Sequence, residues 1–432
     1  KLYAIKIRRD ELGRYNKDHA IRVLKAISQI SSRGQLEHAA VVRASGIACR
    51  VAQMCMGNKL GFRFDDKIAF TSLFEKSFGT VLLSVSEGNS VDKIEQVGGY
   101  LLGETNDTKA ISFNGQLITM EDALAAFEGK LEPIFPTKVD SGAATTYPKI
   151  EDVKADIICP NILKGIKPKV FIPVFPGTNC EYDTARAFER AGADADVMVI
   201  RNRSSEEIKA SLMEMSQRIK NANMVMIPGG FSGGDEPEGS GKFIAAAFRN
   251  AQVTESVRDL LFNRDGLLLG ICNGFQALMK LGLLPYGDIL PLEQDGPTLT
   301  FNRIGRHQSC YSSTKIVTNH SPWLSMTNEG DVFEIAISHG EGRFCADEAL
   351  LKDLFAKGQV ATQYVDDHGV PSMDTCFNPN GSMCAIEGII SPNGRVLGKM
   401  GHSERMGDNI GKNIPGAKDQ KVFEAGVRYF IG

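Results

Sequence analysis

The chain has 432 residues, of which 42% are hydrophobic, and carries a formal net charge of -3. This length predicts two or three domains with full-sized cores, and the charge offers no basic surface for nucleic acid or an anionic membrane. No apolar run reaches the roughly 18 residues of a membrane span. The nine cysteines form no CxxC pair or zinc-ligand spacing, which favours a reduced, cytoplasmic protein.

The first 132 residues mix helical and extended patterns. Apolar positions with helical spacing run through 20–30 and 38–56, and a shorter helix is expected at 121–127. Apolar runs at 78–85 and 109–113 predict strands. This mixed order predicts a small α+β subdomain rather than a doubly wound sheet.

Residues 133–167 show little periodicity. Prolines recur through this stretch, and the run from Asp140 to Thr146 consists of small and polar residues. Such a composition is typical of a linker. We therefore expect it to separate a subdomain at 1–132 from a second domain at 168–432.

Beyond the linker, strands and helices alternate. Short apolar runs predict strands at 170–175, 196–200, 223–227 and 267–271. The helices between them have recognisable ends, one at Gly192 and one opened by a capping box that begins at Ser204. This alternation predicts an α/β domain with a doubly wound, mostly parallel, flavodoxin-like sheet.

The segment Gly270-Ile-Cys272-Asn-Gly274 follows the last of these strands and precedes a helical stretch. Glycines two residues before and after a nucleophile, between strand and helix, are typical of a nucleophile elbow. The helix N-terminus beneath the thiol favours the thiolate. A buried cysteine at a glycine-rich strand end would have the same pattern, so the segment alone leaves both interpretations open.

A thiol nucleophile needs a base, and the base needs an orienting group. His402 follows the apolar stretch 395–400, and Glu404 stands two residues later, on the same side of an extended segment. His339 has the same spacing from Glu341 and is the competing candidate. A glycine-rich loop after the third strand is suited to offer backbone N–H groups to an oxyanion. Taken singly, each of these segments could equally be a polar loop.

Six segments together resemble the glutaminase domain of the phosphoribosylformylglycinamidine (FGAM) synthase family, which is a class I glutamine amidotransferase. The resemblance covers about residues 168–432. It implies hydrolysis of glutamine, with the ammonia used in the ATP-dependent conversion of formylglycinamide ribonucleotide (FGAR) to FGAM in purine biosynthesis. The segments are Phe175-Pro-Gly-Thr-Asn-Cys180, Pro228-Gly-Gly-Phe-Ser232, Gly270-Ile-Cys-Asn-Gly-Phe-Gln276, Ser338-His-Gly-Glu-Gly-Arg343, Asn378-Pro-Asn-Gly-Ser382 and Gly401-His-Ser-Glu-Arg405.

The resemblance also implies residue roles. Cys272 would be the nucleophile, His402 the base and Glu404 its partner. The family's usual Pro-His-Pro-Glu is here Gly401-His-Ser403-Glu, so both prolines are absent. The positions implied to bind glutamine or the oxyanion are Gly229, Gly230, Phe231, Asn273, Gln276, Asn302, Arg303, Ser338, His339, Gly340 and Glu341.

The first part of the chain resembles the last subdomain of the synthetase portion of the same family, through 73–85 and 97–105. Because the chain begins with Lys1 rather than Met, we expect it to be the C-terminal part of the long single-chain form. The glutaminase domain would need no cofactor or metal. The ATP and magnesium of the full enzyme would bind upstream, since 1–137 contains no phosphate-binding loop motif. Glutamine and the synthetase portion are the expected partners.

Three other interpretations stay open. The domain could serve another biosynthetic pathway, in which case FGAR and ATP would not stimulate it. It could be a docking module that no longer hydrolyses glutamine, as the missing prolines beside His402 hint. It could also be a hydrolase or protease with the same elbow, although Gln276, Asn302 and the 338–343 segment argue against a peptide cleft.

Overall fold

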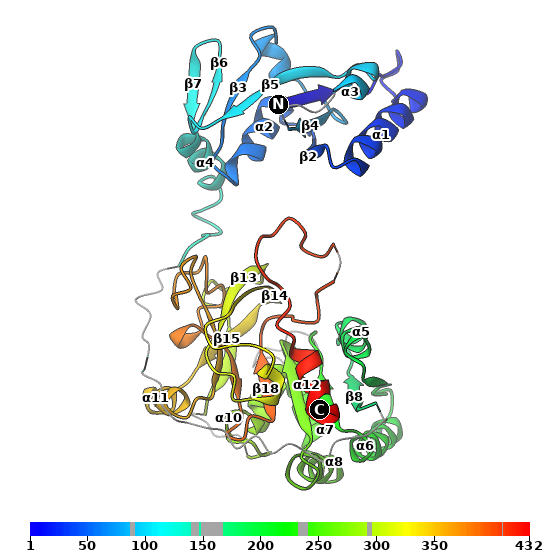
Figure 1. The fold of residues 1–432 in the computed structure, drawn as a ribbon, viewed down its shortest axis with the longest axis vertical. Coiled ribbons are helices and arrows are strands. Elements are labelled where there is room, and N and C mark those ends of the chain that lie inside the picture. The colour runs from blue at the N-terminus through cyan, green and yellow to red at the C-terminus, as the bar shows by residue number, and fades with distance from the viewer. Residues whose placement is uncertain (87–90, 140–146, 148–166, 232–240, 292–295, 408) are drawn as a thin grey trace. The chain divides into compact units, whose positions relative to one another are not determined.

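The computed structural model describes residues 1–86, 91–139, 147, 167–231, 241–291, 296–407 and 409–432. The chain divides into two compact units, Lys1–Pro136 and Thr137–Gly432 (Figure 1). Most of the expected linker, residues 140–146 and 148–166, lies outside the described residues. Within the described residues, no helix is long and apolar enough to cross a membrane.

The first unit is a seven-stranded sheet, ordered β2-β4-β1-β5-β3-β6-β7, with helices packed on it. Its pairs are antiparallel except for β3 and β6, which run parallel. The elements are β1 (Leu2–Ile5), α1 (Lys17–Ser32), β2 (Leu36–Val41), α2 (Gly46–Met56), β3 (Gly61–Phe64), η1 (Phe70–Leu73), β4 (Val81–Val85), α3 (Asp92–Gln96), β5 (Tyr100–Asn106), β6 (Ala110–Phe113), β7 (Gln116–Thr119) and α4 (Met120–Glu128).

Strand β1 explains why both faces of this sheet are covered. All four of its residues are buried, because successive side chains of a strand point to opposite faces. Leu2 and Ala4 join a core cluster with residues of α2 and α4. Tyr3 and Ile5 join another cluster with residues of α1 and α3. The unit is thus the α+β subdomain that its sequence predicts.

The helix expected at 38–56 is wrong in its first half. The chain forms strand β2 there, and α2 begins only at Gly46. Ala39 pairs with Leu83 and Val41 with Val81, both in β4. A strand far along the chain supplies these hydrogen bonds, so tertiary pairing overrides the local helical spacing of the apolar residues.

The second unit is built on a nine-stranded sheet, ordered β14-β13-β16-β17-β18-β11-β10-β8-β9. The elements are β8 (Lys169–Val174), α5 (Glu181–Ala191), β9 (Asp194–Val199), α6 (Ser205–Lys220), β10 (Met224–Ile227), α7 (Lys242–Phe248), α8 (Ala251–Arg258), η2 (Asp259–Asn263), β11 (Leu267–Ile271), α9 (Asn273–Leu281), α10 (Leu283–Tyr286), β12 (Thr298–Phe301), β13 (Gln308–Ile316), η3 (Pro322–Leu324), β14 (Val332–His339), β15 (Glu341–Cys345), α11 (Glu348–Ala356), β16 (Val360–Tyr364), η4 (Met383–Ala385), β17 (Ile386–Ile390), β18 (Val396–Lys399) and α12 (Val422–Ile431).

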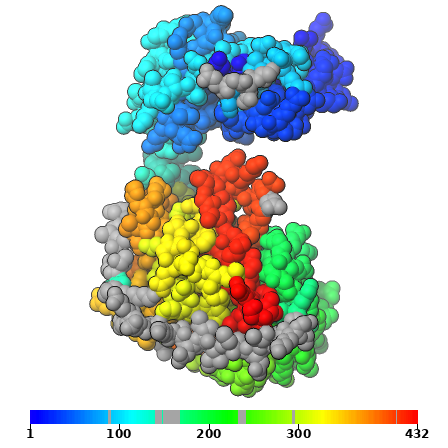
Figure 2. All heavy atoms as spheres, in the orientation of Figure 1, coloured from blue at the N-terminus to red at the C-terminus, as the bar shows by residue number. Residues whose placement is uncertain are grey.

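Strands β9, β8, β10, β11 and β18 are parallel, and this half confirms the predicted α/β class. The other half, from β18 to β14, is antiparallel, an extension that the sequence analysis does not anticipate. Strands β12 and β15 form a separate two-stranded ribbon. On the surface, β13 and the C-terminal segment lie side by side (Figure 2), and Glu334 N–H donates to the Ala417 carbonyl at 2.7 Å.

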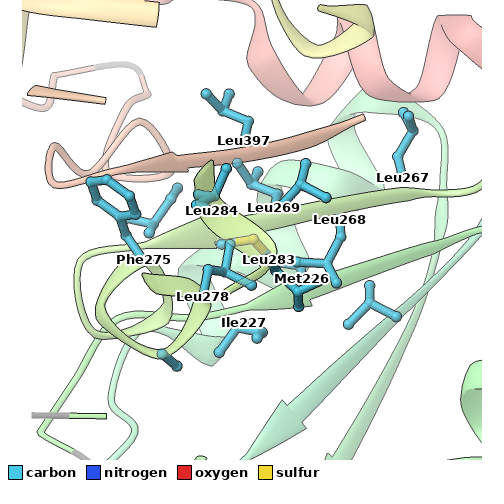
Figure 3. Close-up of a cluster of buried hydrophobic side chains, with 14 of the residues drawn as sticks. Met226, Ile227, Leu267, Leu268, Leu269, Phe275, Leu278, Leu283, Leu284 and Leu397 are labelled. Carbon is cyan, nitrogen blue, oxygen red and sulfur yellow. The ribbon is translucent and has the colours of Figure 1, made fainter. Parts of the chain in front are cut away.

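The core of this unit lies where α9 and α10 pack on the parallel strands (Figure 3). Every residue of β10 and β11 is buried, as expected for parallel strands covered on both faces. Helix α9 comes very close to β10. A Cβ added to Gly274 would lie 2.0 Å from the Ile227 carbonyl oxygen, so only glycine allows this approach.

We predict that Gly274→Ala destabilises the second unit. The added methyl would collide with backbone, so a shift of α9 costing about 1–3 kcal/mol or more is expected. Urea unfolding followed by the fluorescence of Trp323, the chain's one tryptophan, measures this loss.

The matched control is Gly407→Ala, where the new Cβ would lie 3.5 Å from Ile410 Cδ1 in ordinary contact. This variant should stay within about 0.5 kcal/mol of the parent protein. Equal unfolding free energies for the two variants would contradict the close packing of α9 on β10.

Candidate active site

Cys272 stands on the turn between β11 and α9 in an uncommon backbone conformation. Its φ is 53° and its ψ is -107°, and its side chain is 5% exposed. Such a conformation costs about 1–3 kcal/mol and persists only where the surroundings hold it. The flanking glycines provide the space, since a Cβ on Gly270 would lie 2.7 Å from the Gly274 carbonyl carbon. The turn therefore has the geometry of a nucleophile elbow.

His402 reaches the same place from the neighbouring strand. Strands β11 and β18 are parallel, with Ile271 opposite Lys399. The Cys272 N–H donates to the Lys399 carbonyl at 2.8 Å, and the His402 N–H donates to the Ala336 carbonyl at 2.8 Å. The thiol and the imidazole thus lie at the carboxyl ends of adjacent parallel strands, where open α/β sheets place their binding crevices.

The His402 imidazole is held by a carboxylate. Its Nδ1 lies 2.6 Å from Glu404 Oε1, and both side chains are buried. With Nδ1–H donated to Glu404, the lone pair of a neutral ring is on Nε2. That Nε2 is buried and has no hydrogen-bond partner in the described part of the chain. Gly229 makes room for the ring, since a Cβ there would lie 2.8 Å from His402 Cε1.

Nearby charges favour the protonated form of this imidazole. Burial by itself would lower the pKa of His402, but the Glu404 carboxylate and the Cys180 and Cys272 thiols raise the pKa well above 6.5. Burial would raise the pKa of Glu404, yet the His402 imidazole and the Arg405 guanidinium lower it. The site therefore holds an imidazolium–carboxylate pair beside a thiol, an environment that favours the nucleophilic thiolate.

Cys180, which precedes α5, lies on another side of His402. Its Sγ is 3.8 Å from His402 Nδ1, and Arg405 Nη2 donates to it at 3.3 Å. Ligand atoms of Cys180, His402 and Glu404 lie within 4.8 Å of one another, close enough for a metal ion. The guanidinium would repel a cation, and Glu404 already binds Nδ1, so these residues fit a hydrogen-bonded cluster better than a metal site.

Several of the expected glutamine-binding residues gather around Cys272. Its Sγ lies 3.8 Å from the Ser338 carbonyl oxygen. Asn302 donates from its side chain to the His339 carbonyl at 2.8 Å and from its backbone to the Gly340 carbonyl at 2.8 Å. Gln276 Nε2 donates to the Glu341 carbonyl at 2.6 Å, and Asn273 Nδ2 donates to Gln276 Oε1 at 3.0 Å.

The remaining expected residues are placed differently. Gly229 and Gly230 follow β10 and are buried beside the site. The Phe231 N–H donates to the Gly177 carbonyl at 2.8 Å, so in this structure that donor is engaged within the protein. Arg303 is exposed, and its N–H donates to the Asn380 carbonyl at 3.0 Å.

His339 differs from His402 in its electrostatic surroundings. Its Nδ1 lies 3.2 Å from the Asn302 side-chain oxygen, a neutral partner. Burial, with the nearby imidazoles of His402 and His307, lowers the pKa of His339 to about 3. A ring of such low basicity is a poor proton acceptor at neutral pH. This favours His402 over His339 as the base.

The sequence analysis gave no role to Cys180, Arg405, Lys399 or Glu387, all of which lie at or directly behind the site. Cys180 and Arg405 stand within segments singled out for their family resemblance, and their position there was the available signal. Lys399 is a charged residue in the otherwise apolar strand β18, which was a second signal. Glu387 lies in β17, which the sequence analysis did not identify as a strand.

Comparison with known proteins agrees with this geometry. The CobB/CobQ-like glutamine amidotransferase domain matches residues 167–430, so the chain belongs to that family and the protein is a glutamine amidotransferase.

Its relatives include proteins named phosphoribosylformylglycinamidine synthase subunit PurQ. The one from Treponema denticola is 33% identical over 288 residues, 62% of this chain and 100% of that protein. The one from Campylobacter jejuni is 33% identical over 258 residues, 59% of this chain and 95% of that protein. The solved structure of PurLQS from Thermotoga maritima aligns at 25% identity and a TM-score of 0.44, over 61% of this chain and 99% of that chain. The family resemblance inferred from the sequence is thereby confirmed.

We predict that His339 makes the second unit less stable in mild acid. Its native pKa of about 3 lies below the ordinary 6.5, so below 6.5 the unfolded chain binds a proton that the native state does not. Between about pH 7.5 and pH 5 this should cost the parent protein about 1–2 kcal/mol.

His339→Gln should lose this part of the pH dependence. Urea unfolding monitored by Trp323 fluorescence at the two pH values measures the difference. A variant and a parent protein whose unfolding free energies fall equally on acidification would show that the imidazole does titrate normally in the native state.

Proposed function

We propose that the second unit hydrolyses glutamine to glutamate and ammonia through Cys272, His402 and Glu404. The observation that carries the proposal is the His402 ring, with Nδ1 bonded to Glu404 at 2.6 Å and a buried, unpartnered Nε2 beside the thiol in the described chain. A base held by a carboxylate next to an activated nucleophile is the arrangement that acyl transfer requires.

In the proposed reaction, Cys272 Sγ attacks the carboxamide carbon of the glutamine side chain. The tetrahedral intermediate collapses to a thioester, and His402 donates a proton to the departing ammonia. His402 then takes a proton from a water molecule, which hydrolyses the thioester to glutamate and restores the thiol. Backbone N–H groups of Gly230 and Asn273 are the proposed oxyanion donors. If Phe231 N–H is also a donor, it must first leave the Gly177 carbonyl.

Around this centre we assign substrate binding to the residues gathered there: Gly229, Gly230, Phe231, Asn273, Gln276, Asn302, Arg303, Ser338, His339, Gly340 and Glu341. The buried His339 Nε2, which has no hydrogen-bond partner within the described residues, is suited to accept an N–H group of glutamine. Neither a metal nor a cofactor takes part in the proposed hydrolysis.

We further propose that the ammonia serves the ATP-dependent conversion of FGAR to FGAM in purine biosynthesis. The names of the relatives support this pathway. In this assignment, 1–132 is the end of the synthetase portion, 133–167 the linker and 168–432 the glutaminase domain of a long single chain. ATP and magnesium would bind in the upstream portion. Glutamate release that the synthetase portion, FGAR and ATP fail to stimulate would favour another pathway.

Cys272→Ala should abolish glutamate release while leaving the unit folded, because the thiolate makes the attack. A glutamine analogue with a reactive carbon should label Cys272 in the parent protein, which peptide mass spectrometry detects. Cys310→Ala, at an exposed cysteine, is the control and should keep both the activity and the label. A folded Cys272→Ala protein that still releases glutamate would refute the proposed nucleophile, and unlabelled, inactive parent protein would favour the docking module.

Variants of the two histidines should separate catalysis from binding. His402→Ala should lower kcat by about 10²–10⁴-fold through loss of the general base. Glu404→Ala should cost less, because an imidazole without its orienting partner can still take a proton. His339→Ala should mainly raise KM for glutamine. If His339→Ala instead removes kcat and His402→Ala only raises KM, the two roles must be exchanged.

A further inference from the structure

A buried charged pair lies directly behind His402. Lys399 Nζ is 3.4 Å from Glu387 Oε1, and the two side chains are 1% and 0% exposed. Removing two charges from water carries a penalty that their mutual attraction often fails to offset. Such a pair is weak evidence for a stabilising role, so its other contacts show better what it does.

The Lys399 ammonium bonds to the residues on both sides of His402. Its Nζ donates to the Gly401 carbonyl at 3.0 Å and to Ser403 Oγ at 3.0 Å. Glu387 Oε1 accepts the Gly401 N–H at 2.6 Å. The pair thus holds the chain immediately before and after the imidazole.

The loop is in turn shaped to fit the pair. A Cβ on Gly401 would lie 2.9 Å from Glu387 Oε1 and 3.1 Å from Lys399 Nζ, so a side chain there would displace both charges. A proline at 401 would also have no N–H for Glu387. Ser403 Oγ donates onward to Gln420 Oε1 at 2.8 Å. The hydrogen bonds of the pair therefore stand at the two positions where the family's prolines are missing.

Lys399 also contacts the nucleophile through its backbone, because its carbonyl accepts the Cys272 N–H at 2.8 Å. One residue thereby joins the turn that carries the thiol to the loop that carries the imidazole. We propose that Lys399 and Glu387 are positioning residues that set the distance and angle of the His402 ring to the Cys272 thiol. This inference rests on the proposed function, in which His402 is the base.

The test uses the double variant Lys399→Met/Glu387→Gln, which removes both charges together and leaves no unpaired buried ion. The amide introduced at position 387 retains an oxygen for the Gly401 N–H, so the lost contacts are those of the ammonium. Because a small displacement of a catalytic group can cost up to about 10²-fold, we expect kcat to fall about 10- to 100-fold with little change in KM.

A second readout reports the position of His402 without glutamine turnover. The rate of Cys272 alkylation by iodoacetamide is measured against pH, since an imidazolium beside a thiol favours the thiolate. The charged groups facing His402 are Glu404, Cys180, Cys272 and Arg405, and all are kept in the variant. We expect the midpoint of the alkylation profile to move to higher pH.

The matched control is Arg395→Met. Arg395 is a second buried cation, just before the other end of β18, and it is paired with Asp265 at 2.6 Å. Its loss should lower the thermal midpoint but leave kcat and the alkylation profile as in the parent protein. A folded double variant whose kcat and alkylation profile both match those of Arg395→Met would overturn the proposal.

If the double variant does not fold, Ser403→Ala decides the matter, because it removes a single Lys399 contact. It should move the alkylation midpoint in the same direction by less, and a midpoint equal to that of the parent protein would overturn the proposal. A parent protein that never releases glutamate would refute the proposed function instead. The alkylation profiles would still report whether the pair holds His402 near the thiol.

Discussion

The active site depends on the close approach of α9 to strand β10. Gly274 lies so near the Ile227 carbonyl that a Cβ would be 2.0 Å from its oxygen, and this contact fixes where α9 begins. The preceding residue must then turn sharply from β11 into the helix, which places Cys272 at φ 53°. The buried core around β10, β11 and α9 offsets the strain of that turn (Figure 3). The nucleophile is thus positioned by packing rather than by its own hydrogen bonds.

Strand β18 conveys this position to the base. It pairs in register with β11, and its last residue, Lys399, accepts the Cys272 N–H through its carbonyl. His402 comes three residues later, too soon for the chain to drift away from the thiol. Rigid strands therefore set the coarse distance between the two groups, and hydrogen bonds to Gly401 and Ser403 set the finer angle. Proton transfer needs both, because it requires hydrogen-bond reach and alignment.

Local chemistry made much of this site predictable. The Gly-x-Cys-x-Gly segment specifies its own turn, and Glu404 lies within reach of His402 because it is only two residues away. Contacts between distant segments were not predictable in this way. Cys180 approaches His402 across 222 positions of sequence, Glu387 comes from an antiparallel strand that no local pattern revealed, and residues 38–41 join a sheet through β4. In each case the partner is chosen by strand order, which periodicity does not encode.

The two His-x-Glu segments show why spacing alone cannot assign a base. His402 uses Nδ1 to bind the Glu404 carboxylate, which raises the pKa of the imidazole despite its burial. His339 is as deeply buried, but its Nδ1 meets the neutral amide of Asn302, and desolvation then lowers its pKa to about 3. Identical spacing therefore yields one imidazole suited to exchange protons and one suited to stay neutral. The sign of each shift is decided by whether the ring's partner carries a charge.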